Sequence, residues 1–264
     1  MSQSLPPNLL KATTGQYSIS ISDIFAEGWR RIKGIKKSFF GGVILLFFTV
    51  AGILLVSTFL LFSICSASHL CKVASVAYLI IIAIFSVLVF LFSGSLIFLA
   101  LQHLRCKTIE AKMVFEFRKA WKSLIIITSC FCLVCFILGL MNEIVFSKLF
   151  TGGLTSIFYL GMSVKNIITI IFFGYMTLLS NISLLLILDK KMSLKESFTI
   201  AFKSINKQVF KILALLLLAD ILYIGILFIT LGIGLIWVLP FKTLVVAILY
   251  RRIFCQDELG LVSP

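Results

Sequence analysis

Charged residues are scarce in this chain. Asp, Glu, Lys and Arg make up only 13% of its 264 residues, and just 10 residues are acidic. A soluble globular domain carries about 25% charged and about 45–50% apolar residues. Here 61% of the residues are hydrophobic and the mean hydropathy is +1.16. This composition excludes an ordinary soluble domain.

The sequence also lacks the motifs of catalysis and of metal or phosphate binding. Its two histidines, His69 and His103, lie far apart, and neither has a Cys, Asp or Glu at ligand spacing. No Ser, His and acid are grouped for nucleophilic catalysis. Gly232-Ile-Gly234 lacks the strand and the lysine of a phosphate-binding loop. We therefore expect no catalytic residue, no metal and no cofactor, and a protein that is not an enzyme.

The seven cysteines form no metal-binding pattern. Cys130, Cys132 and Cys135 lie in an apolar run, where cysteine behaves as a small hydrophobic residue. Cys65 and Cys71 flank a predicted outer loop, so an oxidising compartment would allow them to pair. We expect two free thiols there.

Long apolar runs dominate what is present. A bilayer crossing needs about 20 apolar residues, and it must be helical because lipid offers no partner to free backbone groups. Alternation of apolar and polar residues, which would indicate strands, is missing. The pattern predicts an all-α membrane protein with six transmembrane helices, at about 39–64, 73–101, 124–146, 166–188, 209–231 and 234–250.

The net charge of +14 is distributed unevenly between the ends of these runs. With a cytoplasmic N-terminus, 20 of the 24 basic residues lie inside, within 11–37, 105–122, 190–211 and 251–252. The positive-inside rule then puts both termini in the cytoplasm of a multi-pass cell-membrane protein, the inner membrane if the source is bacterial. Anionic headgroups, not nucleic acid, are the expected partners of these bases. Alternatively, the bases only determine the topology.

No cleavable signal peptide is evident, because the first apolar run begins after about 38 residues and is longer than an h-region. We expect an uncleaved signal anchor. Residues 1–16, with Pro6, Pro7 and Gly15, are predicted to form a flexible cytoplasmic tail, and 256–264 a second one.

One short pattern occurs three times. Phe25-Ala-Glu-Gly28-Trp29-Arg30-Arg31-Ile32 recurs as Phe117-Arg-Lys-Ala120-Trp121-Lys122-Ser123-Leu124 and as Phe198-Thr-Ile-Ala201-Phe202-Lys203-Ser204-Ile205. Two apolar runs follow each copy. The membrane domain, 17–255, is therefore predicted to contain three repeat units, about 17–101, 108–188 and 190–250, packed around a common axis.

Each copy has the spacing of a basic amphipathic helix, predicted at 20–35, 112–123 and 193–208. Ser20 with Asp23, and Ser193 with Glu196, are the expected N-terminal caps. These helices either fix the entry of each hairpin or form a cytoplasmic collar that recognises lipid or a partner. Predicted interfacial lipid contacts are Trp29, Arg30, Arg31, Trp121, Lys122, Phe202 and Lys203.

The opening Ile21-Ser22-Asp23-Ile24-Phe25-Ala26-Glu27-Gly28-Trp29 resembles the start of YciC-like six-span bacterial inner-membrane proteins. It also resembles the membrane domain attached to some glycerophosphodiester phosphodiesterases. The closing Leu239-Pro240…Tyr250-Arg251 is similar to the last span of those proteins. The resemblance implies a topology, and no catalytic residue carries over.

Two charged residues lie inside predicted spans. Asp220 and Lys242 each lie nine residues from a cytoplasmic base, so both have a computed depth of about 13.5 Å at 1.5 Å per residue. An unpaired charge at such depth costs at least about 2.5–3.5 kcal/mol, which favours an ion pair between them. The pair either locks the last hairpin or belongs to a proton or ion path, with Asn181, Ser183 and Tyr223 as possible polar neighbours.

These observations favour a non-enzymatic membrane protein with a scaffold, assembly or lipid-associated role. The alternative is a small-solute or ion transporter that uses Asp220 and Lys242.

Overall fold

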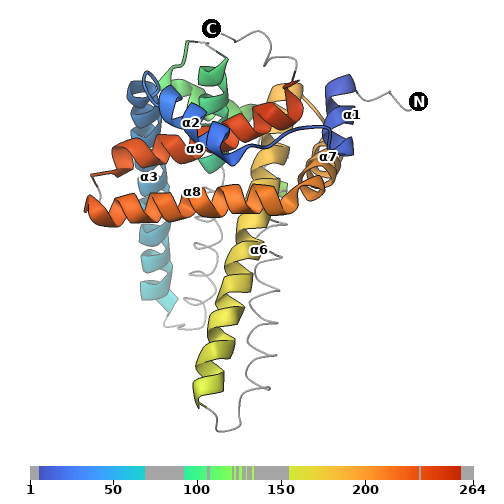
Figure 1. Cartoon of the computed structure of the whole chain (residues 1–264). Coiled ribbons are helices and arrows are strands. Elements are labelled where there is room, and N and C mark those ends of the chain that lie inside the picture. Colours follow the sequence, from blue (N-terminus) through green and yellow to red (C-terminus); the bar gives the residue numbers. More distant parts are fainter. Residues whose placement is uncertain are drawn as a thin grey trace.

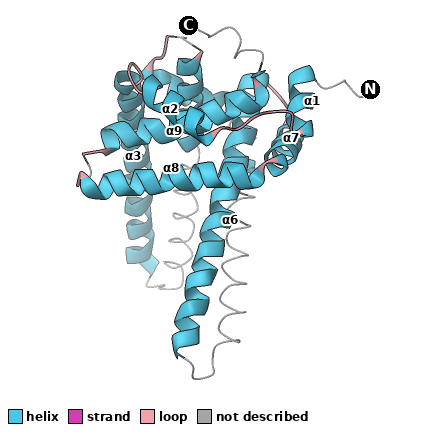
Figure 2. Cartoon of the chain, viewed as in Figure 1, coloured by secondary structure: helices cyan, strands magenta, loops and turns pink. Residues whose placement is uncertain are grey.

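The computed structural model shows an all-helical chain over the part that it describes, which confirms the predicted all-α class. The described residues are 6–68, 92–105, 108–120, 155–231 and 233–256, with single positions at 122, 125, 126, 129 and 133. The helices are α1 (Pro7–Thr14), α2 (Ile21–Arg31), α3 (Lys36–Ser68), the 3-10 helix η1 (Ala111–Ala120), α6 (Thr155–Lys190), α7 (Leu194–Lys207), α8 (Val209–Ile229) and α9 (Leu235–Phe254) (Figures 1 and 2). A shorter apolar helix, Phe92–Leu104, precedes η1.

The last two helices run in a different direction from α3 and α6. In Figure 1, α3 and α6 extend downward, whereas α8 and α9 run across them, and α8 contacts α6. The described helices α8 and α9 therefore do not repeat the direction of α3 and α6, whereas the common axis of three similar hairpins stays a prediction. The runs at 73–101 and 124–146 lie largely outside the described residues.

A contact between α3 and α9 shows how far the last hairpin departs from the predicted arrangement. Lys36 begins α3, and its Nζ lies 4.8 Å from the centroid of the Trp237 ring. The sequence pattern placed Lys36 at the cytoplasmic side of the membrane and Trp237 near the outer side. Because they touch, the turn end of the α8–α9 hairpin lies at the level where α3 begins.

The two predicted caps form. Ser20 Oγ accepts a hydrogen bond from the Asp23 backbone N–H at 3.4 Å, and Ser193 Oγ accepts one from Glu196 at the same distance. Both interactions satisfy a backbone donor that a helix start would otherwise leave unpaired. The predicted helix at 112–123 overlaps the 3-10 helix η1, and its Trp121 lies outside the described residues.

Within the predicted flexible tail at 1–16, residues Pro7–Thr14 form a helix instead. Leu9 and Ala12 of α1 are buried, and α1 contacts α7 and α9. Gly15 ends α1 with φ of 82°, a left-handed conformation that glycine adopts without a Cβ penalty. Directly after α1, Tyr17 Oη donates to the Ser204 carbonyl oxygen at 2.6 Å, and burial raises the pKa of Tyr17 to about 12. The prolines at 6 and 7 indicated a helix start, not disorder.

Helix α2 packs closely on α9 at Gly28. A Cβ atom at this glycine would lie 3.2 Å from Phe241 Cε2, so a larger residue would require the Phe241 ring to shift by a few tenths of an ångström. Phe25 and Trp29 flank the glycine, and each packs edge-to-face on Phe241, with centroid distances of 5.4 Å and 5.8 Å.

Two buried ion pairs hold the same end of the molecule together. Glu27 of α2 pairs with Arg251 of α9, and these side chains are only 12% and 5% exposed. Arg252 Nη2 lies 3.6 Å from the other Glu27 oxygen. Buried charges are tolerated only when they are paired and hydrogen-bonded, so Glu27 and Arg251 constrain how α2 sits on α9.

The second pair joins Arg105, the residue after the helix Phe92–Leu104, to α6 and α9. Arg105 forms two hydrogen bonds to Asp189, one of them 3.1 Å from Nη2 to Oδ2. Tyr250 Oη donates to the same carboxylate at 3.0 Å. Burial opposes ionisation of Asp189, but the hydrogen bonds and charge of Arg105 outweigh it, so the pKa of Asp189 lies below its usual value.

We predict that replacing Arg251 by Met lowers the free energy of unfolding by about 3–5 kcal/mol, because it leaves the Glu27 charge buried with a weaker partner. Thermal or denaturant unfolding of the purified protein measures this. The double variant Glu27→Gln/Arg251→Met should recover part of the loss. Arg30→Met, which removes an exposed arginine from α2, is the matched control and should change stability by less than about 0.5 kcal/mol. Strictly additive single effects would contradict a direct pair.

Candidate functional site

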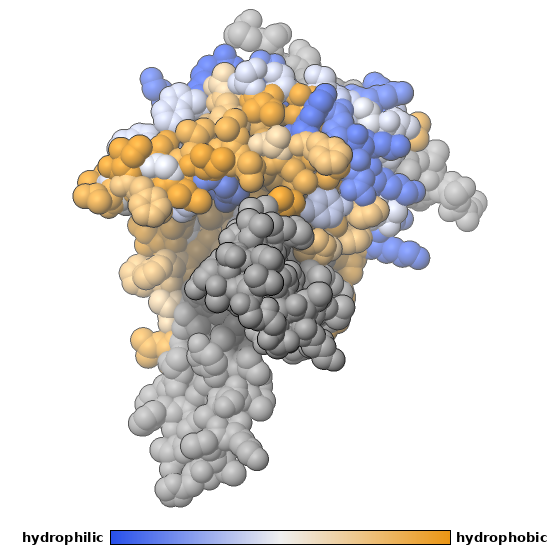
Figure 3. Space-filling view, turned by 60° about the horizontal axis from the view of Figure 1, so that its bottom comes forward, coloured by the Kyte–Doolittle hydropathy of each residue, from blue (hydrophilic) through white to orange (hydrophobic). Residues whose placement is uncertain are grey.

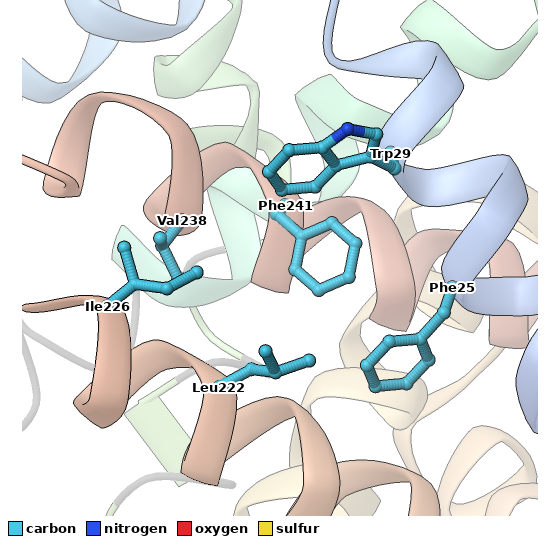
Figure 4. Close-up of a pocket in the computed structure, with 6 residues that line it drawn as sticks. All are labelled: Phe25, Trp29, Leu222, Ile226, Val238 and Phe241. Atoms are coloured by element: carbon cyan, nitrogen blue, oxygen red, sulfur yellow. The ribbon is translucent and has the colours of Figure 1, made fainter.

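An apolar pocket lies where α2, α8 and α9 meet. Its lining residues are Phe25, Trp29, Leu222, Ile226, Val238 and Phe241, and its volume is about 300 Å³. Figure 4 shows the aromatic rings of α2 on one side and the aliphatic side chains of α8 and α9 on the other. This volume is at the lower end of the range for small-molecule sites, which are mostly apolar and concave. The pocket can therefore hold a narrow apolar group.

The close packing of α2 on α9 positions this pocket. Phe25 and Trp29 are four residues apart on α2, so both rings project from one face of the helix. Gly28 brings that face onto α9, and α8 closes the side away from α2. Trp29 remains 57% exposed, which leaves the pocket open to the surface.

A lysine of α3 contacts α9 one helical turn before the pocket residue Phe241. Lys36 Nζ stands over the ring of Trp237, which is four residues before Phe241 on α9 and therefore on the same helix face. A cation over a tryptophan face is attracted by the ring quadrupole. The apolar pocket is thus one helical turn along α9 from a positively charged side chain.

Asp220 and Lys242 form the predicted ion pair between α8 and α9. Lys242 Nζ also lies 5.4 Å from the Tyr223 ring centroid, so Tyr223 is a neighbour of the pair as expected. The side chains of Lys242 and Asp220 are 43% and 48% exposed. The pair therefore lies at the surface of the protein.

The other two predicted polar neighbours of the pair have different partners. Asn181 Oδ1 accepts a hydrogen bond from Ser93 Oγ at 3.2 Å, across the contact between α6 and Phe92–Leu104. Ser183 is fully buried and donates to the Leu179 carbonyl oxygen at 2.7 Å. Asn181 therefore joins α6 to Phe92–Leu104, Ser183 bonds within α6, and neither hydrogen bond leads towards Asp220.

The predicted interfacial side chains that the structure describes are mostly exposed. Trp29, Arg30, Lys122, Phe202 and Lys203 are exposed, and Arg31 is partly buried. On α7 the buried side consists of Ser197, Ile200, Ala201, Ser204 and Ile205. Phe198 and Phe202 lie outside this buried side and are 43% and 45% exposed. Small residues face inward because they allow α7 to lie close to α1 and α6.

The surface around the pocket is strongly apolar. Within the described part of the chain, α8 is the one helix long and apolar enough to cross a membrane, with a hydropathy of 2.8 and only 17% of its span buried. Figure 3 shows a band of hydrophobic residues across the face that carries α8, with hydrophilic residues at the upper rim and to the right. Exposed members of the band on α8 are Phe210, Leu217, Leu218, Ile221, Ile224, Phe228 and Ile229.

Within the described ranges, no group of three or more His, Cys, Asp or Glu side chains could hold a metal ion. His103 serves the fold, since its Nε2 lies 3.1 Å from the Arg31 carbonyl oxygen, and burial lowers the pKa of this histidine. No protein-family model, curated protein or solved structure matches the chain.

Sequence reasoning missed the pocket and its lysine. The signal for the α2 side was visible, because Phe25, Gly28 and Trp29 share a helix face. The partner face, with Leu222, Ile226, Val238 and Phe241, is indistinguishable in the sequence from the other apolar residues of its runs.

We predict that Asp220→Asn and Lys242→Met each reduce the yield of folded protein, while the double variant recovers part of it. Each single change leaves a charge on an apolar surface, where an unpaired charge costs about 2.5–3.5 kcal/mol if that surface contacts lipid. In water an exposed pair contributes only about 0–1 kcal/mol. Size-exclusion profiles before and after heating measure the folded fraction. Wild-type behaviour of both single variants would show that the pair has no structural role.

Proposed function

We propose that this chain is an integral cell-membrane protein with a non-enzymatic scaffold, assembly or lipid-associated role, related to the YciC-like proteins it resembles. The observation that carries the proposal is the exposed apolar surface of α8, next to an end of the molecule that is rich in ion pairs. A monomeric soluble protein rarely exposes a contiguous apolar area of this kind. The six apolar runs and the uneven distribution of bases support a multi-pass topology with both termini in the cytoplasm.

Two arrangements of the last hairpin follow. In the six-span arrangement predicted from the sequence, α8 and α9 cross the bilayer, and the turn at 230–234 lies outside. In the other, the hairpin lies within the cytoplasmic half of the bilayer and four runs cross, which also leaves both termini inside. We favour the second because Lys36 at the start of α3 contacts Trp237 close to that turn. It also places the charges of Asp220 and Lys242 near the headgroups, where they cost less.

Cysteine labelling in a cysteine-free background tests the membrane proposal. Lys33→Cys and Lys203→Cys should react only with a reagent that reaches the cytoplasm. Leu231→Cys, in the turn and 93% exposed, should resist an impermeant reagent added outside. Lys148→Cys should react, because it lies in the predicted outer segment between the spans at 124–146 and 166–188. Outside labelling of Leu231→Cys would restore six spans. Outside labelling at position 33 or 203, or release of the protein by alkaline carbonate, would overturn the proposal.

A transporter is the second candidate function, and the Asp220–Lys242 pair beside Tyr223 favours it. Asn181 and Ser183 bond to other residues, so they do not extend the Asp220–Lys242 pair into a longer polar pathway. One acid and one base alone are a short pathway for a proton or ion. Transport also calls for interrupted helices at matching positions, which the repeat units do not supply.

For the scaffold role we expect that vesicles containing the purified protein show no proton-coupled flux above protein-free vesicles. A pH-sensitive dye inside the vesicles measures the flux across a set of amino acids, sugars and metal ions. Flux that is present in the wild type and lost in Asp220→Asn, with folding retained, would establish the transporter instead.

A further inference from the structure

We propose that the pocket between α2, α8 and α9 binds an acyl chain of an anionic phospholipid from the surrounding bilayer, with Lys36 next to its headgroup. This inference rests on the proposed membrane function and names its ligand. The pocket is lined by Phe25, Trp29, Leu222, Ile226, Val238 and Phe241, and the indole N–H of Trp29 is the one polar side-chain group among them. A lining of this kind provides little hydrogen-bonding specificity and selects for a hydrocarbon group.

The position of the pocket matches the boundary between headgroups and acyl chains. On one side lies α2, with the exposed Arg30 and a tryptophan whose ring is 57% exposed. On the other side lies α8, where Ile221 and Ile224 are more than half exposed. Tryptophan is enriched at this depth of a membrane because it has an apolar ring and a polar N–H. A chain that enters between the two helices therefore comes from the lipid side and leaves its headgroup on the α2 side.

Charge selects among lipids. The ammonium group of Lys36 lies 4.8 Å from the Trp237 ring, on the same face of α9 as Phe241 in the pocket. Two further lysines, Lys33 and Lys37, are exposed within four residues of Lys36 along the chain. Positive charge next to an apolar pocket is complementary to a phosphate without a compensating amine. We therefore expect phosphatidylglycerol to bind in preference to phosphatidylcholine.

Tryptophan fluorescence reports on this pocket directly. The chain has three tryptophans, at 29, 121 and 237, so Trp121→Phe leaves one that lines the pocket and one beside it. This variant is reconstituted in bilayers that contain a minor fraction of lipid brominated in its acyl chains. Bromine quenches a tryptophan on contact. Brominated phosphatidylglycerol should bind about fivefold better than brominated phosphatidylcholine, the preference expected from one basic residue near a headgroup.

Two variants separate the headgroup from the acyl chain. Lys36→Gln should abolish the preference for phosphatidylglycerol while leaving acyl-chain quenching in place, and Lys37→Gln is its matched control. Leu222→Phe/Ile226→Phe fills the pocket and should reduce quenching by both lipids severalfold. Its control is Leu217→Phe/Ile229→Phe, which makes the same changes at exposed positions of α8 that do not line the pocket.

Each outcome decides a separate point. Equal quenching in the filled variant and its control would overturn the acyl-chain site. Equal binding of the two lipids, or an unchanged preference in Lys36→Gln, would overturn the role of the lysine. A dimer whose tryptophans neither lipid quenches would show that a second copy of the chain occupies the pocket. If the filled variant does not fold, the comparison of Lys36→Gln with Lys37→Gln still tests whether Lys36 selects the anionic lipid. Release of the protein by carbonate refutes the membrane function itself, whereas a carbonate-resistant protein without selective quenching refutes only this inference.

Discussion

The packing of α2 on α9 is the constraint on which the rest of the described structure depends. It combines an apolar contact, in which Phe241 fits against Gly28, with the buried pair of Glu27 and Arg251. A buried charge tolerates little displacement of its partner, so the pair fixes the register of the two helices. The direction of α9, and with it that of α8, follows from this contact.

The sequence motifs that suggested a protein family are the two halves of this one contact. The opening segment supplies Glu27, Gly28 and Trp29, and the closing segment supplies Phe241 and Arg251. Their shared role is to join the beginning of the chain to its end. This explains why segments more than 200 residues apart carry the most distinctive residues, and why those residues include no catalytic group.

The site is a by-product of the same geometry. Because α2 packs on α9, the rings of Phe25 and Trp29 lie opposite side chains of α8 and α9. An apolar pocket remains between these three helices. The crossing direction of α8 leaves its apolar residues facing outward. A surface that is apolar and bordered by lysines is suited to lipid, which is why the proposed role and the proposed ligand depend on one architecture.

The sequence by itself determined the local structure. The hydrophobic runs favour helices, and the side chains of Ser20 and Ser193 cap the starts of two of them. Asp220 pairs with Lys242 because an isolated charge in an apolar run is energetically costly. The tertiary structure alone decided which surfaces meet. A run of Leu, Ile and Phe is apolar on every side, so it does not encode the direction in which it packs. That choice was made by Gly28, Glu27 and Arg251, whose contacts turn the last hairpin across α6 and bring Trp237 to Lys36.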